Sequence, residues 1–199
     1  VVAAVACGLA LDVEEEAIAQ GIAAVTGVPG RFERVDEGQS FEVIVDYAHT
    51  PAGLENILHS ARELAKKRKL ICLFGCGGDR DRGKRPVMGK IAANGADQVI
   101  ITSDNPRKED PASILDEIEV GIPEHTRAQV ECEVDRFAAI VQALERARAG
   151  DCVLIAGKGH ETKQEFEDHW IEFDDAKVAG KWLKERFAQP TTAETETRS

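Results

Sequence analysis

The stretch that decides the fold is residues 70–78 (LICLFGCGG), a run of apolar residues that passes directly into a glycine-rich loop. Two more runs have the same design: residues 98–102 (QVIIT) lead into residues 103–107 (SDNPR), and residues 152–156 (CVLIA) lead into residues 157–161 (GKGHE). Helical patterns separate the three runs, and alternation of strand and helix predicts a parallel sheet. We therefore expect three loops at one edge of a sheet, where open α/β sheets bind ligands.

The same alternation extends over most of the 199 residues and predicts an α/β fold, a Rossmann-like, mostly parallel sheet flanked by helices. Further strands are expected near residues 43–45 and 129–132, and an edge strand is expected at 170–173. Helices are expected at residues 52–67, 86–94, 111–121, 136–149 and 175–187.

The first 28 residues differ from the rest because they are alanine-rich and predict two helices joined near residues 8–12. They are too few to build a core of their own. We expect residues 1–34 to be the end of a preceding domain and residues 35–189 to form the sheet domain. Residues 190–199 hold no apolar anchor, so we expect them to be a disordered tail.

Composition narrows the class of partner. The 25 basic and 36 acidic residues give a net charge of -11, which opposes binding to nucleic acid or to an anionic membrane. No apolar stretch approaches the roughly 20 residues that span a bilayer, and the first residues lack the features of a signal peptide. We expect a cytoplasmic protein. The five cysteines have no CxxC spacing, and Cys72, Cys132 and Cys152 lie in or beside apolar runs, so we expect these three to be reduced, buried structural thiols. Cys76 lies in a loop with no catalytic base near it in the sequence.

The three loops carry side chains that suit a small charged ligand. Two arginines, Arg80 and Arg107, are natural receptors for carboxylates. The acidic and amide groups of Asp104, Asn105 and Glu161 can hold an amine, and the loop glycines are expected to let backbone approach the ligand. Such a set favours a zwitterion with more than one carboxylate and amine.

Other interpretations of these loops are weaker. Residues 78–85 (GDRDRGKR) nearly match the phosphate-binding pattern GxxxxGK[ST], but Arg85 stands where a hydroxyl would bind magnesium. The dinucleotide pattern fails because Arg80 replaces its third glycine. Residues 104–107 taken alone favour an ordinary turn, and Lys158 taken alone fits a solvent-exposed charge.

Asp46 and His49 follow the first strand of the sheet, so we expect them at the same edge. An aspartate and a histidine without a third ligand at fixed spacing are a weak metal signal, so no metal site is predicted in this chain.

Five ordered motifs carry a resemblance to a known family. They are residues 30–33 (GRFE), 46–51 (DYAHTP), 75–86 (GCGGDRDRGKRP), 104–107 (DNPR) and 157–161 (GKGHE). In this order and spacing they closely resemble the carboxyl-terminal part of the Mur ligases. The resemblance covers nearly the whole chain up to about residue 190.

The resemblance implies an ATP-dependent amide ligase of peptidoglycan precursor synthesis. In that family ATP phosphorylates the glutamate carboxylate of UDP-MurNAc-L-Ala-D-Glu, and the amine of an incoming amino acid attacks the acyl phosphate. An arginine that closes the DNPR motif resembles the versions that add meso-diaminopimelate. Matching positions imply that the amino acid is bound by Arg80, Asp104, Asn105, Arg107, Gly157 and Glu161, and ATP by Arg31, Asp46 and His49.

The chain also departs from the family pattern. Nothing in it matches the GKT phosphate loop, the carbamylated lysine that helps to hold Mg²⁺, or the domain that binds the UDP group. The resemblance therefore implies a part that selects substrate, has no catalytic residue of its own and is inactive alone, with most of the ATP and Mg²⁺ site outside it. Lys163 stands where the family often has an aromatic residue. Two alternatives stay open: a relative that adds lysine or another amino acid, and a non-catalytic amino-acid-binding module.

Overall fold

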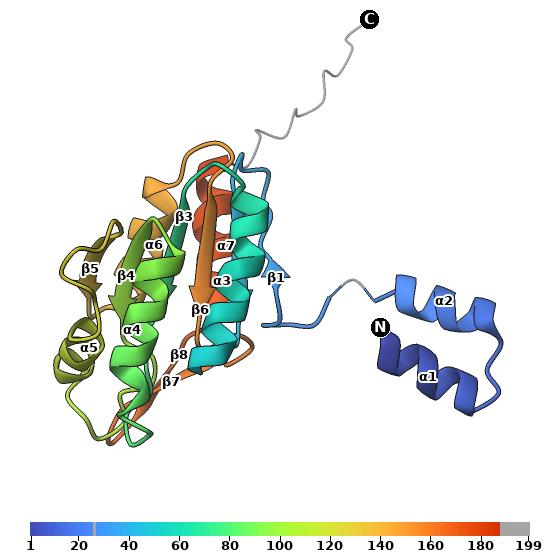
Figure 1. The fold of residues 1–199 in the computed structure, drawn as a ribbon, viewed down its shortest axis with the longest axis horizontal. Helices are drawn as coiled ribbons and strands as arrows, with labels where there is room; N and C mark the ends of the chain where they lie inside the picture. The colour runs from blue at the N-terminus through green and yellow to red at the C-terminus, as the bar shows by residue number, and fades with distance from the viewer. Residues whose placement is uncertain (26, 188–199) are drawn as a thin grey trace, which may run out of the picture.

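The structure is a computed structural model that describes residues 1–25 and 27–187. Its centre is a six-stranded sheet with the strand order β1-β2-β6-β3-β4-β5 (Figure 1). All neighbouring strands are parallel except β1, which pairs antiparallel with β2. The predicted fold class is confirmed. The strands are β1 (Glu33–Arg34), β2 (Glu42–Asp46), β3 (Leu70–Phe74), β4 (Gln98–Thr102), β5 (Gln129–Glu133) and β6 (Cys152–Ala156).

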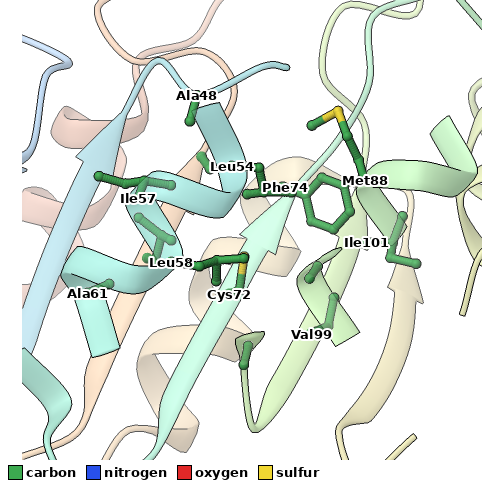
Figure 2. Close-up of a cluster of buried hydrophobic side chains, with 14 of the residues drawn as sticks. Ala48, Leu54, Ile57, Leu58, Ala61, Cys72, Phe74, Met88, Val99 and Ile101 are labelled. Atoms are coloured by element: carbon green, nitrogen blue, oxygen red, sulfur yellow. The ribbon is translucent and has the colours of Figure 1, made fainter. Parts of the chain in front are cut away.

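Helices cover both faces of the sheet, and each face has its own apolar core. Helices α3 (Pro51–Ala65), α4 (Lys84–Gly95) and α5 (Pro111–Glu119) pack on one face, and α6 (Arg136–Arg146) and α7 (Asp175–Phe187) pack on the other. Figure 2 shows the first core, where Leu54 and Leu58 of α3 lie over Cys72 and Phe74 of β3. Alternate residues of β3, β4 and β6 feed the two cores, which is why these three strands are buried along their whole length.

Two predicted helix starts are confirmed. Thr50 caps α3 by accepting a hydrogen bond from the backbone N–H of Gly53, and Asp110 caps α5 by accepting one from Ser113. Pro51 and Pro111 each occupy the first turn, where the missing N–H of proline costs nothing.

The direction in which successive strands are added to the sheet reverses beside β6. The chain runs from β3 outward to β4 and β5, and then returns through α6 to insert β6 between β2 and β3. The carboxyl ends of β2, β6, β3 and β4 are therefore neighbours. Such a switch point leaves a crevice for a ligand in open α/β sheets.

Two expectations about strands and thiols are wrong. The strand expected at residues 170–173 is not an edge of the main sheet, because β8 (Trp170–Glu172) pairs antiparallel with β7 (Lys163–Glu165) in a separate hairpin. The sequence offered no signal for β7, since its three residues are all polar. Cys132 is exposed on β5, whereas Cys72 and Cys152 are buried as expected.

The amino-terminal segment forms the two expected helices, α1 (Val2–Ala10) and α2 (Glu15–Ala23), and neither buries a residue. Figure 1 shows them to one side of the sheet. The boundary predicted at residue 34 falls inside the sheet, because β1 pairs with β2. The tail predicted at residues 190–199 lies outside the described residues. No described helix is long and apolar enough to cross a bilayer.

Candidate functional site

A pocket of about 710 Å³ opens at the carboxyl edge of the sheet, between the loops that follow β2, β3, β4 and β6. A hollow of about 800 Å³ beside α7 is larger, but its lining includes none of the predicted binding residues. The described lining of the edge pocket omits Arg31 and Asp46. It brings together the other predicted residues, which are His49, Arg80, Asp104, Asn105, Arg107, Gly157 and Glu161.

The glycines of these loops mainly let the loops pack against each other. A Cβ atom at Gly78 would lie 1.9 Å from the carbonyl oxygen of Pro106, and one at Gly159 would lie 2.7 Å from Cβ of Tyr47. We expected these glycines to make room for a ligand, so this expectation is wrong for both positions. Gly157 differs because it lines the pocket, with a φ of +116° that favours glycine.

Lys158 is fully buried, which corrects its interpretation as a solvent-exposed charge. Its ammonium group donates to Oδ1 of Asn105 at 2.9 Å, to Oε2 of Glu161 at 3.1 Å and to the carbonyl oxygen of Lys163 at 2.5 Å. A buried charge needs a counter-charge and hydrogen bonds, and Lys158 has both. It therefore joins the loop after β4 to the loop after β6.

Asn105 and Glu161 complete this network. Nδ2 of Asn105 donates to Oε2 of Glu161 at 2.8 Å, and Oδ1 also accepts from the backbone N–H of Glu165 at 3.0 Å. Oε2 of Glu161 thus has two donors, whereas Oε1 has no hydrogen bond within the described residues. We call Asn105, Lys158 and Glu161 the buried half of the pocket. It presents one carboxylate oxygen to a cationic group.

Arg107 also lines the pocket, and its side chain is 24% exposed. Its φ is +52°, and its backbone N–H donates to the carbonyl oxygen of Glu165 at 3.0 Å. The guanidinium donates from Nη1 to the carbonyl oxygen of Gly78 at 2.9 Å, and Nε lies 3.0 Å from Oε2 of Glu165. Nη2 makes no hydrogen bond to a described residue, so one nitrogen is available to an anion.

Arg80 is the second arginine of the pocket and is exposed. Its one hydrogen bond to a described residue goes from Nη1 to the carbonyl oxygen of Asp79, at 3.1 Å. Arg80 and Arg107 together are called the arginine half. They differ in that the Arg107 guanidinium contacts Gly78 and Glu165, whereas the Arg80 guanidinium contacts only the neighbouring residue Asp79.

Arg85 anchors the loop that carries Arg80. It is fully buried at the start of α4, where Nη2 lies 2.8 Å from Oε1 of Glu109 and Nη1 lies 2.8 Å from Oε2 of Glu117. Hydrogen bonding to Arg85 lowers the pKa of Glu109 to about 2. Glu109 in turn accepts from the backbone N–H of Asp79 at 2.7 Å. The residue that breaks the phosphate-loop pattern therefore holds the pocket loop in place.

A second buried arginine lies beneath the pocket. Arg136 of α6 and Asp175 of α7 are both fully buried and form a two-bond pair, at 2.8 Å and 2.7 Å. The same guanidinium donates to the carbonyl oxygens of Ser103 at 3.0 Å and Ala156 at 3.2 Å. These carbonyls precede Asp104 and Gly157, so the pair ties two strand ends to the helices behind them.

The residues expected to bind ATP lie next to the pocket, around Tyr47. The carboxylate of Asp46 accepts hydrogen bonds from the backbone N–H groups of Phe32 at 2.8 Å and Ala48 at 2.9 Å, so it shapes this loop. The guanidinium of Arg31 lies 4.7 Å from the centre of the Tyr47 ring. The His49 ring contacts the same tyrosine edge to face.

Cys76 is buried, and burial raises its pKa to about 12, so it is an inert thiol. Across residues 1–25 and 27–187, no group of three or more His, Cys, Asp and Glu side chains is arranged to hold a metal ion.

Sequence reasoning missed Lys158, Arg85, Arg136 and Glu165 as parts of this site. Each is a charged residue that local patterns place on a surface or in a turn. A partner far along the chain is what changes that assignment, and a single sequence does not show it.

The comparison with protein families decides the class of the chain. A family model described as "Mur ligase, glutamate ligase domain" matches residues 30–159, which include all the residues that line the pocket except Glu161. The chain belongs to the Mur ligase family.

Individual relatives agree with this assignment. The chain is similar to the UDP-N-acetylmuramoyl-L-alanyl-D-glutamate--2,6-diaminopimelate ligase of Syntrophomonas wolfei, with 56% identity over 92% of this chain. A ligase of the same name from Solibacter usitatus is 54% identical, also over 92% of the chain. A solved Mur ligase structure of the same name matches 93% of the chain with 38% identity and a TM-score of 0.73.

The chain spans only 37% of the length of each of these relatives.

Proposed function

We propose that this chain is the amino-acid-selecting, carboxyl-terminal part of an ATP-dependent ligase that adds meso-diaminopimelate to UDP-MurNAc-L-Ala-D-Glu. The observation that carries the proposal is the pocket, which is lined by two arginines and by a carboxylate that accepts hydrogen bonds from Lys158 and Asn105. The names of the relatives, which are diaminopimelate ligases, support the same substrate.

The two halves of the pocket match the two kinds of group on diaminopimelate. Nη2 of Arg107 is the available donor for a carboxylate, and Arg80 is close enough in the same lining to assist. Oε1 of Glu161 and the carbonyl of Gly157 are acceptors for the ammonium group of the same stereocentre. In lysine that carbon carries no carboxylate, so lysine would leave Nη2 of Arg107 without an ion pair.

The three residues proposed for ATP do not all have side-chain groups available to a ligand. Arg31 and His49 are exposed beside Tyr47 and fit a nucleotide that lies over this ring. Asp46 has both oxygens committed to backbone N–H groups, so we propose that it supports ATP by holding the loop. The described residues form no acidic cluster for Mg²⁺, and we propose that the remaining ATP and Mg²⁺ ligands come from the rest of the ligase.

The domain division follows from this proposal. Residues 1–34 would be the end of the central domain, with residues 30–34 lying against the sheet domain that begins at residue 35. We place the ligase in the cytoplasm, where ATP and a nucleotide-linked precursor are available.

The test is the ratio of kcat/KM for diaminopimelate over lysine, measured with the complete ligase that carries this chain. We expect a ratio of at least about 10, because one additional charge-assisted pair contributes about 1.5–3 kcal/mol. A ratio near one, or a preference for lysine, would refute the diaminopimelate assignment. Binding of diaminopimelate without amide formation in the presence of all substrates would instead favour a non-catalytic module.

A further inference from the structure

Strand β7 is hydrogen-bonded to the loop after β4, which carries Asp104, Asn105 and Arg107. Nε2 of Gln164, which is buried, donates to the carbonyl oxygen of Asp104 at 2.8 Å. The next residue, Glu165, donates from its backbone N–H to Asn105 at 3.0 Å and accepts from the backbone N–H of Arg107 at 3.0 Å. Two consecutive residues of β7 therefore hold Asp104, Asn105 and Arg107 in register.

The side chain of Glu165 adds a contact of a different kind. Its Oε2 lies 3.0 Å from Nε of Arg107, while the carbonyl oxygen of Gly78 accepts from Nη1 at 2.9 Å. Two points on the guanidinium are thus fixed from outside the pocket. Nη2, with no hydrogen bond to a described residue, is the nitrogen that remains for a ligand.

We propose that Glu165 is a specificity-determining positioning residue, which orients the Arg107 guanidinium so that Nη2 meets the distal carboxylate of the amino acid. The inference rests on the function proposed above. Glu165 itself touches no substrate atom in this arrangement. It acts through Arg107.

Glu165 has two opposing effects on a bound carboxylate, and their sizes decide the sign. Its negative charge repels the carboxylate, but its side chain is 51% exposed, so solvent screens this repulsion to about 2-fold in affinity or less. Without Glu165 the long Arg107 side chain must be ordered by the substrate, which costs about 3- to 10-fold in affinity. Orientation therefore outweighs repulsion, and Glu165 favours the dicarboxylate substrate.

The ion pair between Glu165 and Arg107 also bears on how the pocket discriminates against lysine. Arg107 keeps Glu165 and the Gly78 carbonyl as partners whatever the pocket holds. Bound lysine does not leave a wholly unpaired guanidinium, so selectivity comes from the pair that diaminopimelate gains.

The experiment compares Glu165→Ala, Glu165→Gln and the control Glu167→Ala in the complete ligase, with diaminopimelate and with lysine. Glu167 is exposed on the turn of the same hairpin and lies outside the pocket lining. We expect Glu165→Ala to raise KM for diaminopimelate about 3- to 10-fold with little change in kcat, and to leave lysine kinetics unchanged. Glu165→Gln keeps an acceptor for Nε and should restore KM to within about 2-fold of the parent.

Three outcomes would overturn the inference. An unchanged KM for diaminopimelate would show that Arg107 needs no orientation, and a lowered KM would make Glu165 a competing counter-ion. An equal loss with both amino acids would point to general damage. The parent ratio of diaminopimelate over lysine tests the proposed function separately, because it does not depend on either variant.

Discussion

The two halves of the pocket are built differently. In the buried half, Lys158 is fully buried and donates three hydrogen bonds within the protein. In the arginine half, Arg107 is partly exposed, and Arg80 is exposed with one hydrogen bond to its own loop. The hydrogen bonds of Lys158 in the first half help to hold the fold together, whereas the arginines of the second half are partly or fully exposed to solvent.

This difference separates stability from recognition. Removing a charged group whose hydrogen-bond partners all belong to the protein mainly lowers the stability of the folded state. Removing a group that has an unused hydrogen-bond donor mainly weakens ligand binding. We therefore expect substitution of Lys158 to be seen in unfolding, and substitutions in the arginine half to be seen in kinetics.

We expect the largest effect from Lys158→Met. A small loss of stability in this variant would contradict the difference drawn between the two halves of the pocket. The change removes the cation that holds Asn105 and Glu161, and it should lower the free energy of unfolding by about 2–4 kcal/mol. Urea unfolding of the chain measures this as a lower midpoint with an unchanged slope. Lys108 is exposed near the pocket, so Lys108→Met is the control and should stay within about 0.5 kcal/mol.

Arg107→Ala should come next and should act mainly on kinetics. Loss of one charge-assisted pair should reduce kcat/KM for diaminopimelate about 10- to 100-fold in the complete ligase. Arg107→Lys keeps the charge but not the planar fork, so it should recover only part of the loss. If both variants used diaminopimelate like the parent, the arginine half would be a surface feature.

The ion pair between Arg85 and Glu109, which anchors the loop that carries Arg80, should make a smaller and pH-dependent contribution to stability. The pKa of Glu109 in the folded chain is about 2, below its ordinary value of 4.5, because it bonds to Arg85. A lowered pKa gives stability that is complete above about pH 4.5 and is lost as the pH falls toward 2.

We expect this loss to be about 1–2 kcal/mol after allowance for solvent screening and for the second partner of Arg85, which is Glu117. Urea midpoints of the parent and of Glu109→Gln between pH 6 and pH 3 measure it. The variant should be less stable at pH 6 and should depend less on pH. Parallel curves would assign the acid sensitivity to other carboxylates.

Arg80→Ala should have the smallest effect. An exposed arginine with no fixed geometry contributes about 0.2–1 kcal/mol to an ion pair, so kcat/KM for diaminopimelate should fall only about 2- to 5-fold. Measurement at two salt concentrations sharpens the comparison, because screening should weaken the Arg80 contribution more than that of Arg107. A loss as large as that of Arg107→Ala would mean that the loop closes over the substrate.

Much of the fold followed from the sequence because it depends on local patterns. Apolar runs marked β2, β3, β4 and β6, and helical patterns marked the helices between the strands. Strand β7 was missed, since three polar residues leave no periodic signal and its pairing partner is β8. The pocket residues Arg107 and Glu161 were found because each lies in a loop that follows directly on a strand.

What the sequence by itself determined is the order of the elements and the kinds of side chain that reach the carboxyl edge. Only the tertiary structure decided which of those charges are free. Lys158 meets Asn105 across 53 residues, Arg85 meets Glu109 across 24 and Arg136 meets Asp175 across 39. Desolvation and pairing decide whether a charge holds the fold together or remains available to a ligand, and both depend on partners that lie far away along the chain.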